Sequence, residues 1–153
     1  MKSLSPLKVL TLATAMLMPF ATHAETATLN TVKADLHKIP SQARSAGSVT
    51  QLATDQQGQG LVMLRSLKKG DVTPPHKTGT QAVRLGVVVS GVIYHGVGET
   101  LDLSKETAYH PGDVILMSAS HTYWMAARDA DASIMFTFVP PAQLNPALLE
   151  QMK

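Results

Sequence analysis

The sequence predicts an all-β protein built as a sandwich or barrel, for three reasons. Short segments that are rich in β-branched residues, or that alternate apolar and polar residues, recur along most of the chain. Turns containing glycine or proline separate these segments at short intervals. A helical pattern is confined to the end of the chain. Many short strands with regular turns and almost no helix are typical of a β-sandwich or β-barrel.

The N-terminus, residues 1–24, has the three regions of a secretory signal peptide. Lys2 and Lys8 give a positive start, a mostly apolar run follows, and small residues stand at the −3 and −1 positions before Glu25. The apolar run is about 12 residues, which is short for a membrane span. We therefore expect cleavage before Glu25 and a periplasmic or secreted protein. The alternatives are an uncleaved anchor and a buried N-terminal helix.

Charge and composition argue against several classes of function. The whole chain has 13 Lys and Arg against 11 Asp and Glu, but both lysines of the signal peptide are lost on cleavage, which leaves 11 against 11. A formally neutral mature chain without a basic stripe does not indicate a nucleic-acid partner. No second hydrophobic segment suggests a membrane span after cleavage. The absence of cysteine excludes disulfides, thiol catalysis and cysteine-ligated zinc.

The mature sequence divides into an N-terminal arm at 25–46, a β-barrel at 47–141 and a short C-terminal helix within 142–153. Residues 32–36 of the arm could add an edge strand. Strands of the barrel are expected, in order, at 48–54, 61–67, 82–89, 92–97, 114–117, 122–126 and 133–139.

Two of these segments are defined by particular residues. In the strand at 61–67, one face carries Leu61, Met63, Arg65 and Leu67, and the other carries Val62, Leu64 and Ser66, because side chains alternate along a strand. Asn145 followed by Pro146 is typical of a helix start, with Asn as the N-cap and Pro in the first turn.

Two glycine–histidine patterns lie in the middle of the chain. Gly70 is followed by five residues and His76, with Gly91 further along; Gly112 is followed by five residues, a three-residue segment and His121. The wider run adds Pro74, Pro75, Gly98, Glu99, Pro111, Asp113, Met117 and Trp124. These residues resemble the two motifs of the cupin family, and in particular a group of small exported bacterial cupins. The resemblance implies a cupin-type jelly-roll barrel.

The resemblance also implies where a metal would bind, and the sequence departs from that pattern. Metal-binding cupins use three histidines and one carboxylate around one ion, which leaves open positions for water or substrate. His76 matches the first position and His121 the last. Thr78 stands at the second histidine position and Arg84 at the glutamate position. Threonine is a poor ligand and a permanently cationic arginine repels a divalent ion, so the resemblance implies a degenerate metal site.

Register leaves further arrangements open. The interval from His76 to Gly91 is longer than the family usually shows, so a bulge near 77–83 could bring Gln81 to the carboxylate position in place of Arg84. Alternation after Gly91 sends only one of Tyr94 and His95 inward, and the resemblance favours Tyr94 as the residue that lines the pocket.

We weigh three hypotheses of different classes. The first, which we favour, is a barrel that binds a small anionic or carbonyl ligand without a catalytic metal. Its pocket residues would be His76, Thr78, Arg84, Tyr94, His121 and Trp124. The second is a dioxygenase- or isomerase-type enzyme in which a divalent transition metal is held by His76 and His121, with Gln81, Tyr94 or His95. The third is a structural role as a homodimer scaffold. No nucleophile triad or phosphate-binding loop is visible, so the sequence does not decide whether the protein is an enzyme.

Overall fold

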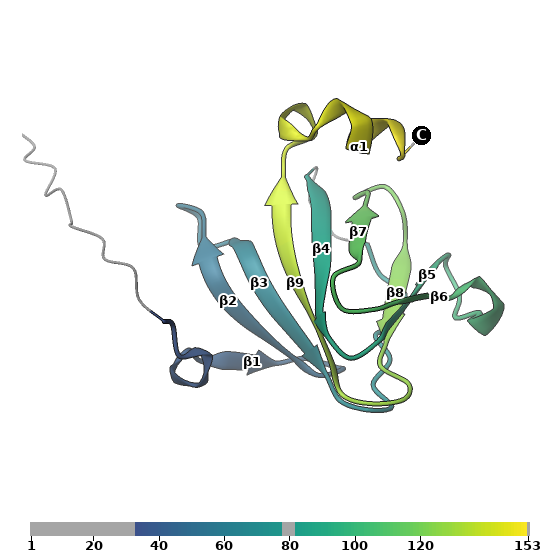
Figure 1. Cartoon of the computed structure of the whole chain (residues 1–153), viewed down its shortest axis with the longest axis horizontal. Coiled ribbons are helices and arrows are strands. Elements are labelled where there is room, and N and C mark those ends of the chain that lie inside the picture. The colour runs from purple at the N-terminus through teal and green to yellow at the C-terminus, as the bar shows by residue number, and fades with distance from the viewer. Residues whose placement is uncertain (1–32, 78–81, 153) are drawn as a thin grey trace, which may run out of the picture. The chain divides into compact units, whose positions relative to one another are not determined.

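A computed structural model describes residues 33–77 and 82–152 (Figure 1). By its internal contacts the chain divides into a unit ending at Lys33 and a unit beginning at Ala34, and every element below belongs to the second unit. The predicted signal peptide lies outside the described residues, as do Thr78 and Gln81 of the expected pocket. In the part of the chain that is described, no helix is long and apolar enough to cross a membrane.

The described residues form strands, three short 3-10 helices and one α-helix. The strands are β1 (Ser41–Ala43), β2 (Ser48–Thr54), β3 (Gly60–Leu67), β4 (Val83–Ser90), β5 (Ile93–Val97), β6 (Thr107–Tyr109), β7 (Val114–Met117), β8 (Tyr123–Ala126) and β9 (Ala132–Val139). The helices are η1 (Leu36–Lys38), η2 (Leu103–Lys105), η3 (Pro141–Gln143) and α1 (Pro146–Glu150). The predicted fold class, all-β with a short C-terminal helix, is confirmed.

The strands form two antiparallel sheets. One has six strands in the order β1-β2-β3-β9-β4-β7, and the other has three in the order β6-β5-β8 (Figure 1). Isolated antiparallel bridges from Val72 to Ala126 and from His76 to Tyr123 attach the segment between β3 and β4 to β8. That segment contains the two prolines, which fits an extended edge position.

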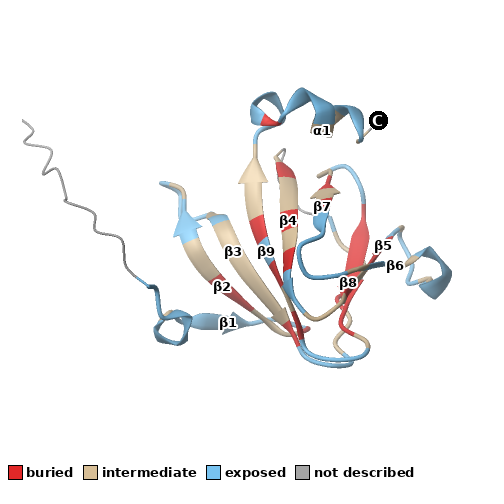
Figure 2. Ribbon diagram, in the orientation of Figure 1, coloured by how far each residue is buried: buried red, intermediate tan, exposed pale blue. Residues whose placement is uncertain are grey.

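The core lies between the two sheets. Leu67, Ile134 and Phe136 of the six-stranded sheet belong to one buried cluster with Ile93 and Tyr123 of the three-stranded sheet. Figure 2 shows that β8 is buried along its whole length, whereas β1 and α1 are exposed or nearly so. Strand β8 therefore carries side chains that face the interior from the smaller sheet.

The N-terminal arm differs from expectation, whereas the C-terminal helix matches it. The edge strand of the arm lies at Ser41–Ala43 and pairs with β2, whereas residues 36–38 form η1, which is capped by Asp35. The edge strand predicted at 32–36 is therefore wrong in position. The C-terminal helix begins as predicted, since Asn145 Oδ1 accepts a hydrogen bond from the Ala147 amide at 2.9 Å.

Candidate ligand pocket

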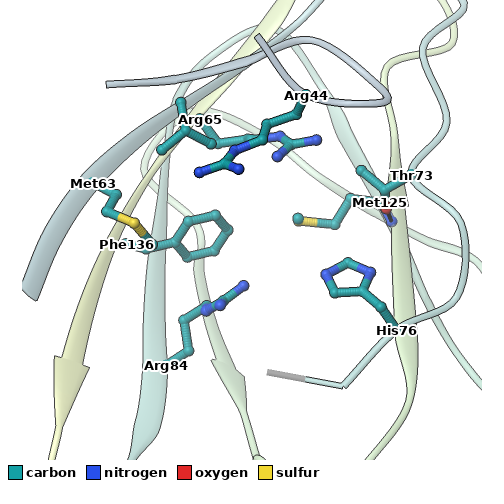
Figure 3. A pocket seen from close by; sticks show the side chains of 9 residues that line it. Arg44, Met63, Arg65, Thr73, His76, Arg84, Met125 and Phe136 are labelled. Carbon is teal, nitrogen blue, oxygen red and sulfur yellow. Dashed lines mark hydrogen bonds between the residues drawn. The ribbon is translucent and has the colours of Figure 1, made fainter. Parts of the chain in front are cut away.

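A cavity of about 180 Å³ lies inside the barrel, and we call it the barrel cavity. It is lined by Arg44, Val49, Met63, Arg65, Thr73, His76, Arg84, Met125 and Phe136 (Figure 3). These residues come from both sheets, from the arm and from the proline segment that attaches to β8. Two of them, His76 and Arg84, belong to the pocket expected from the sequence.

Strand alternation places Arg84 in the interior. Its guanidinium carbon lies 5.0 Å from the ring centroid of Phe136 and 4.8 Å from that of Phe138, and Nη1 donates a hydrogen bond to the Tyr123 hydroxyl at 2.5 Å. Its Nε is buried and has no hydrogen-bond partner among the described residues. Burial lowers the pKa of Arg84, because the charged form is poorly solvated there.

Two further arginines reach the same cavity, and the sequence did not single them out as site residues. Arg65 points inward from β3 and donates through Nη2 to the Ala46 carbonyl, while its Nε is also buried without a partner in the described chain. Arg44 follows β1, lies exposed, and donates to Gln42 Oε1 at 2.9 Å. Burial lowers the pKa of Arg65, and the neighbouring charges of Arg44 and Arg84 lower it further, while the Asp71 carboxylate partly opposes them.

Among the described residues, no acidic side chain lines the cavity or forms an ion pair with these cations, although Asp71 acts on Arg65 from outside the lining. The cavity lining, taken over residues 33–77 and 82–152, contains no Asp or Glu. The ion pairs between described residues involve Lys38, Lys68, Lys105, His110 and Arg128, and none of the three cavity arginines. The barrel cavity therefore concentrates positive charge beside an apolar wall.

His76 is fixed in the cavity by its own backbone. Its amide donates to the Tyr123 carbonyl at 3.0 Å, and its carbonyl accepts from the Tyr123 amide at 3.1 Å. The ring Nδ1 lies 2.8 Å from the Pro74 carbonyl oxygen. Because a carbonyl only accepts, Nδ1 carries the proton in this contact. In the neutral tautomer with the proton on Nδ1, the Nε2 lone pair is left to accept a hydrogen bond.

His95 and His121 line a different, smaller cavity of about 50 Å³, together with Tyr123. His95 is 8% exposed, its ring stacks on Tyr123 at 5.4 Å, and its Nε2 has no partner among the residues described. Burial lowers its pKa to about 4, so it is neutral at neutral pH. His121 lies exposed at this smaller cavity and does not line the barrel cavity.

Tyr94 and Trp124, which we expected at the pocket, lie on the other faces of their strands. On β5 it is His95 that turns inward, and the Tyr94 hydroxyl donates to Asp129 Oδ2 at 2.6 Å. On β8, Tyr123 and Met125 face the interior, so Trp124 faces the opposite side. Its indole Nε1 donates to Glu106 Oε1 at 2.8 Å. These two expectations are corrected by the alternation of β5 and β8.

A metal ion of the kind found in many cupins does not fit the residues that are described. No group of three His, Cys, Asp or Glu side chains among them is close enough to hold an ion. His76 and His121, the two matched ligands, line separate cavities. The polar groups that line the cavity beside His76 include the Thr73 hydroxyl, the thioethers of two methionines and three guanidinium groups, and the guanidinium charge opposes a divalent cation.

Solved structures of other proteins share this architecture. The CENP-C cupin domain of Drosophila melanogaster is similar with a TM-score of 0.54 at 12% identity, over 71% of this chain and 85% of that one. This chain has the cupin fold. KdgF from Halomonas sp. is 17% identical, with a TM-score of 0.52 over 68% of this chain and 90% of its own. A predicted oxalate decarboxylase from Thermotoga maritima is 11% identical, with a TM-score of 0.56 over 71% and 99%.

At these identities the likeness establishes the cupin fold and not an activity, because one fold supports many functions. No protein-family model matches the sequence, and no curated protein matches it. The function must therefore be argued from the barrel cavity itself.

Proposed function

We propose that this cupin-fold protein binds a small organic anion in the barrel cavity. The observation that carries the proposal is the set of Arg44, Arg65 and Arg84 at one cavity, with no carboxylate partner among the described residues. An anion would complete the charge balance that the protein leaves open.

Two of the three arginines, Arg65 and Arg84, have a buried guanidinium nitrogen. Taking a guanidinium out of water costs several kcal/mol unless charges or hydrogen bonds compensate. Arg65 and Arg84 each have one donor hydrogen-bonded and a buried Nε without a partner in the described chain. A carboxylate accepts two parallel hydrogen bonds from one guanidinium, which is the compensation that is missing.

The remaining lining favours an organic anion over an inorganic one. Met63, Met125 and Phe136 supply apolar surface beside the cations. Thr73 Oγ1 accepts the Met125 amide at 2.8 Å, so its hydroxyl hydrogen is left to donate to another acceptor. The cavity, at about 180 Å³, is smaller than the roughly 300–1,000 Å³ of drug-sized sites, which limits the ligand to few atoms.

Isothermal titration calorimetry on the whole protein tests this proposal. We expect a panel of short carboxylates to bind at low ionic strength, and the amides with the same carbon skeletons not to bind. Arg84→Met should weaken carboxylate binding by about tenfold or more, since a hydrogen bond to a charged group contributes roughly 1.5–3 kcal/mol.

Lys105→Met is the matched control, because Lys105 is an exposed cation paired with Asp102 on η2 and does not line the barrel cavity. It should leave the affinity unchanged. Equal binding of carboxylates and amides, or no binding of any carboxylate, would overturn the proposal. A melting curve of each variant confirms that it is folded.

A further inference from the structure

The cations of the barrel cavity occupy two places, separated along the sheet. Across strand β9, Arg65 pairs with Ile134 and Arg84 pairs with Phe138, so the two arginines are four strand positions apart. At about 3.3 Å per residue this separates their backbones by roughly 13 Å along the strand direction. Both side chains turn into the same interior, and Figure 3 shows Arg44 beside Arg65 and Arg84 across the cavity from them.

An apolar band lies between the two cationic places. Phe136 stands midway between Ile134 and Phe138 on β9, with Met63 paired on one side and Gly86 on the other. A Cβ on Gly86 would lie 2.9 Å from the Phe136 ring, so glycine here makes room for that ring. Met63, Gly86 and Phe136 carry no charge. An anion bound at one end of the cavity therefore does not neutralise the cation at the other end, and the band offers no charged group that could do so.

From this arrangement we infer that the barrel cavity selects a short dianion, with an anionic group at each end of a carbon chain. One carboxylate bound near Arg65 leaves Arg84 without a counter-charge, and one bound near Arg84 leaves Arg44 and Arg65 without one. A dicarboxylate with a few methylene groups could pair one carboxylate with Arg65 and the other with Arg84. Its carbon chain would then pack against Phe136. We expect a compact dianion such as inorganic phosphate to meet only one of the two places. This inference rests on the proposed function and adds the number and spacing of the ligand's charges.

The test is a chain-length series measured by calorimetry on the whole protein. The probes are succinate, glutarate and adipate, the monocarboxylates butyrate, valerate and hexanoate with matching carbon numbers, and inorganic phosphate. We expect one dicarboxylate to bind at least tenfold tighter than its matched monocarboxylate and tighter than phosphate. Its affinity should fall more steeply with added salt, because more charges are paired in the complex.

Two variants locate the two ends. Arg65→Gln and Arg84→Gln should each reduce the preference for the dicarboxylate over its matched monocarboxylate to about one, while Lys105→Gln leaves it unchanged. The wild-type series alone decides the inference if a variant fails to fold. Equal affinity of monocarboxylates and dicarboxylates overturns the dianion inference and leaves the proposed function standing. Phosphate as the tightest ligand overturns the dianion inference and also the preference for an organic anion. No binding of any anion in the series overturns both.

Discussion

Two arginines of this protein occupy contrasting sites. Arg128, on the outer side of the three-stranded sheet, donates through Nε to Glu106 Oε2 at 2.7 Å and through Nη2 to Oε1. Glu106 also accepts the indole N–H of Trp124, and its side chain is only 4% exposed. Arg84, in the barrel interior, has the neutral Tyr123 hydroxyl as its hydrogen-bond partner and three aromatic rings around it.

The pKa directions follow this difference. Hydrogen bonds from Arg128 lower the pKa of Glu106, and the same contact raises the pKa of Arg128. Burial instead lowers the pKa of Arg84. The outer pair is complete within the protein, so removing either partner should destabilise the fold, whereas the interior cation is incomplete and is the one that would gain from a ligand. The three predictions below test this distinction.

The largest effect is expected when the outer pair is broken. Glu106→Ala leaves Arg128 without its carboxylate and Trp124 Nε1 without its acceptor, so we expect a loss of about 3 kcal/mol in the free energy of unfolding. Chemical denaturation measures it. Anion binding in the barrel cavity should persist, because Glu106 does not line it.

Asp102→Ala is the matched control for that prediction. Asp102 pairs with Lys105 at 3.4 Å, but both side chains are more than a third exposed. Exposed pairs contribute about 0–1 kcal/mol, so this variant should remain close to wild type. If both variants lose the same small amount, the outer pair is not the stabilising element that we describe.

The second prediction concerns His95, an interior group that is kept neutral because nothing pairs with its charge. Its pKa in the folded protein is about 4, below the ordinary histidine value of 6.5. The unfolded chain therefore binds the proton first as the pH falls, and stability is lost between about pH 6.5 and pH 4. The loss attributable to His95 should reach roughly 2–3 kcal/mol near pH 4.5, at about 1.4 kcal/mol per pH unit.

His95→Gln removes this proton-binding difference. Urea unfolding of wild type and variant at pH 7.5 and pH 4.5 should show a smaller loss of stability in the variant, by that amount. Acidic groups that also titrate in this window are common to both proteins and cancel in the comparison. Parallel pH profiles would show that His95 is not held neutral by burial.

The fold was predictable from the sequence because its signals are local. β-branched runs and glycine turns identified β3, β4 and β9 closely, and Asn145 marked the start of α1. Strand β6 was missed, since it has only three residues, Thr107–Tyr109, which are too few to show alternation. The edge strand of the arm was misplaced because its pairing with β2 depends on tertiary contacts, which the local sequence does not show.

Residues that line the cavity could be predicted only where their position along a strand determines which way the side chain points. Arg84 and His76 came from the motif, and the alternation that grouped Arg65 with Met63 already held the signal for a second interior arginine. Nothing local marks Arg44, which reaches the cavity through the pairing of β1 with β2. Tyr94 and Trp124 were misassigned because a shift of one residue in register exchanges the two faces of a strand.

The smallest expected effect is a gain in the free energy of unfolding, whereas Glu106→Ala is expected to lower it. In the double variant Arg84→Met, Tyr123→Phe, the interior cation and its hydroxyl partner are both replaced by apolar groups of similar shape. Such replacements of buried polar pairs are often neutral or stabilising. We expect the ligand-free protein to gain about 1 kcal/mol in the free energy of unfolding, because an incompletely compensated cation has been removed.

The same change at the outer pair should fail. Arg128→Met leaves the Glu106 carboxylate buried without its cation, so it should destabilise the protein while the interior double variant does not. Anion binding should be lost in the double variant and retained in Arg128→Met. A double variant that loses stability as Arg128→Met does would mean that Arg84 is already compensated within the barrel. In that case the proposed difference between Arg128, which is compensated within the protein, and Arg84, which would be compensated by a ligand, would have no physical basis.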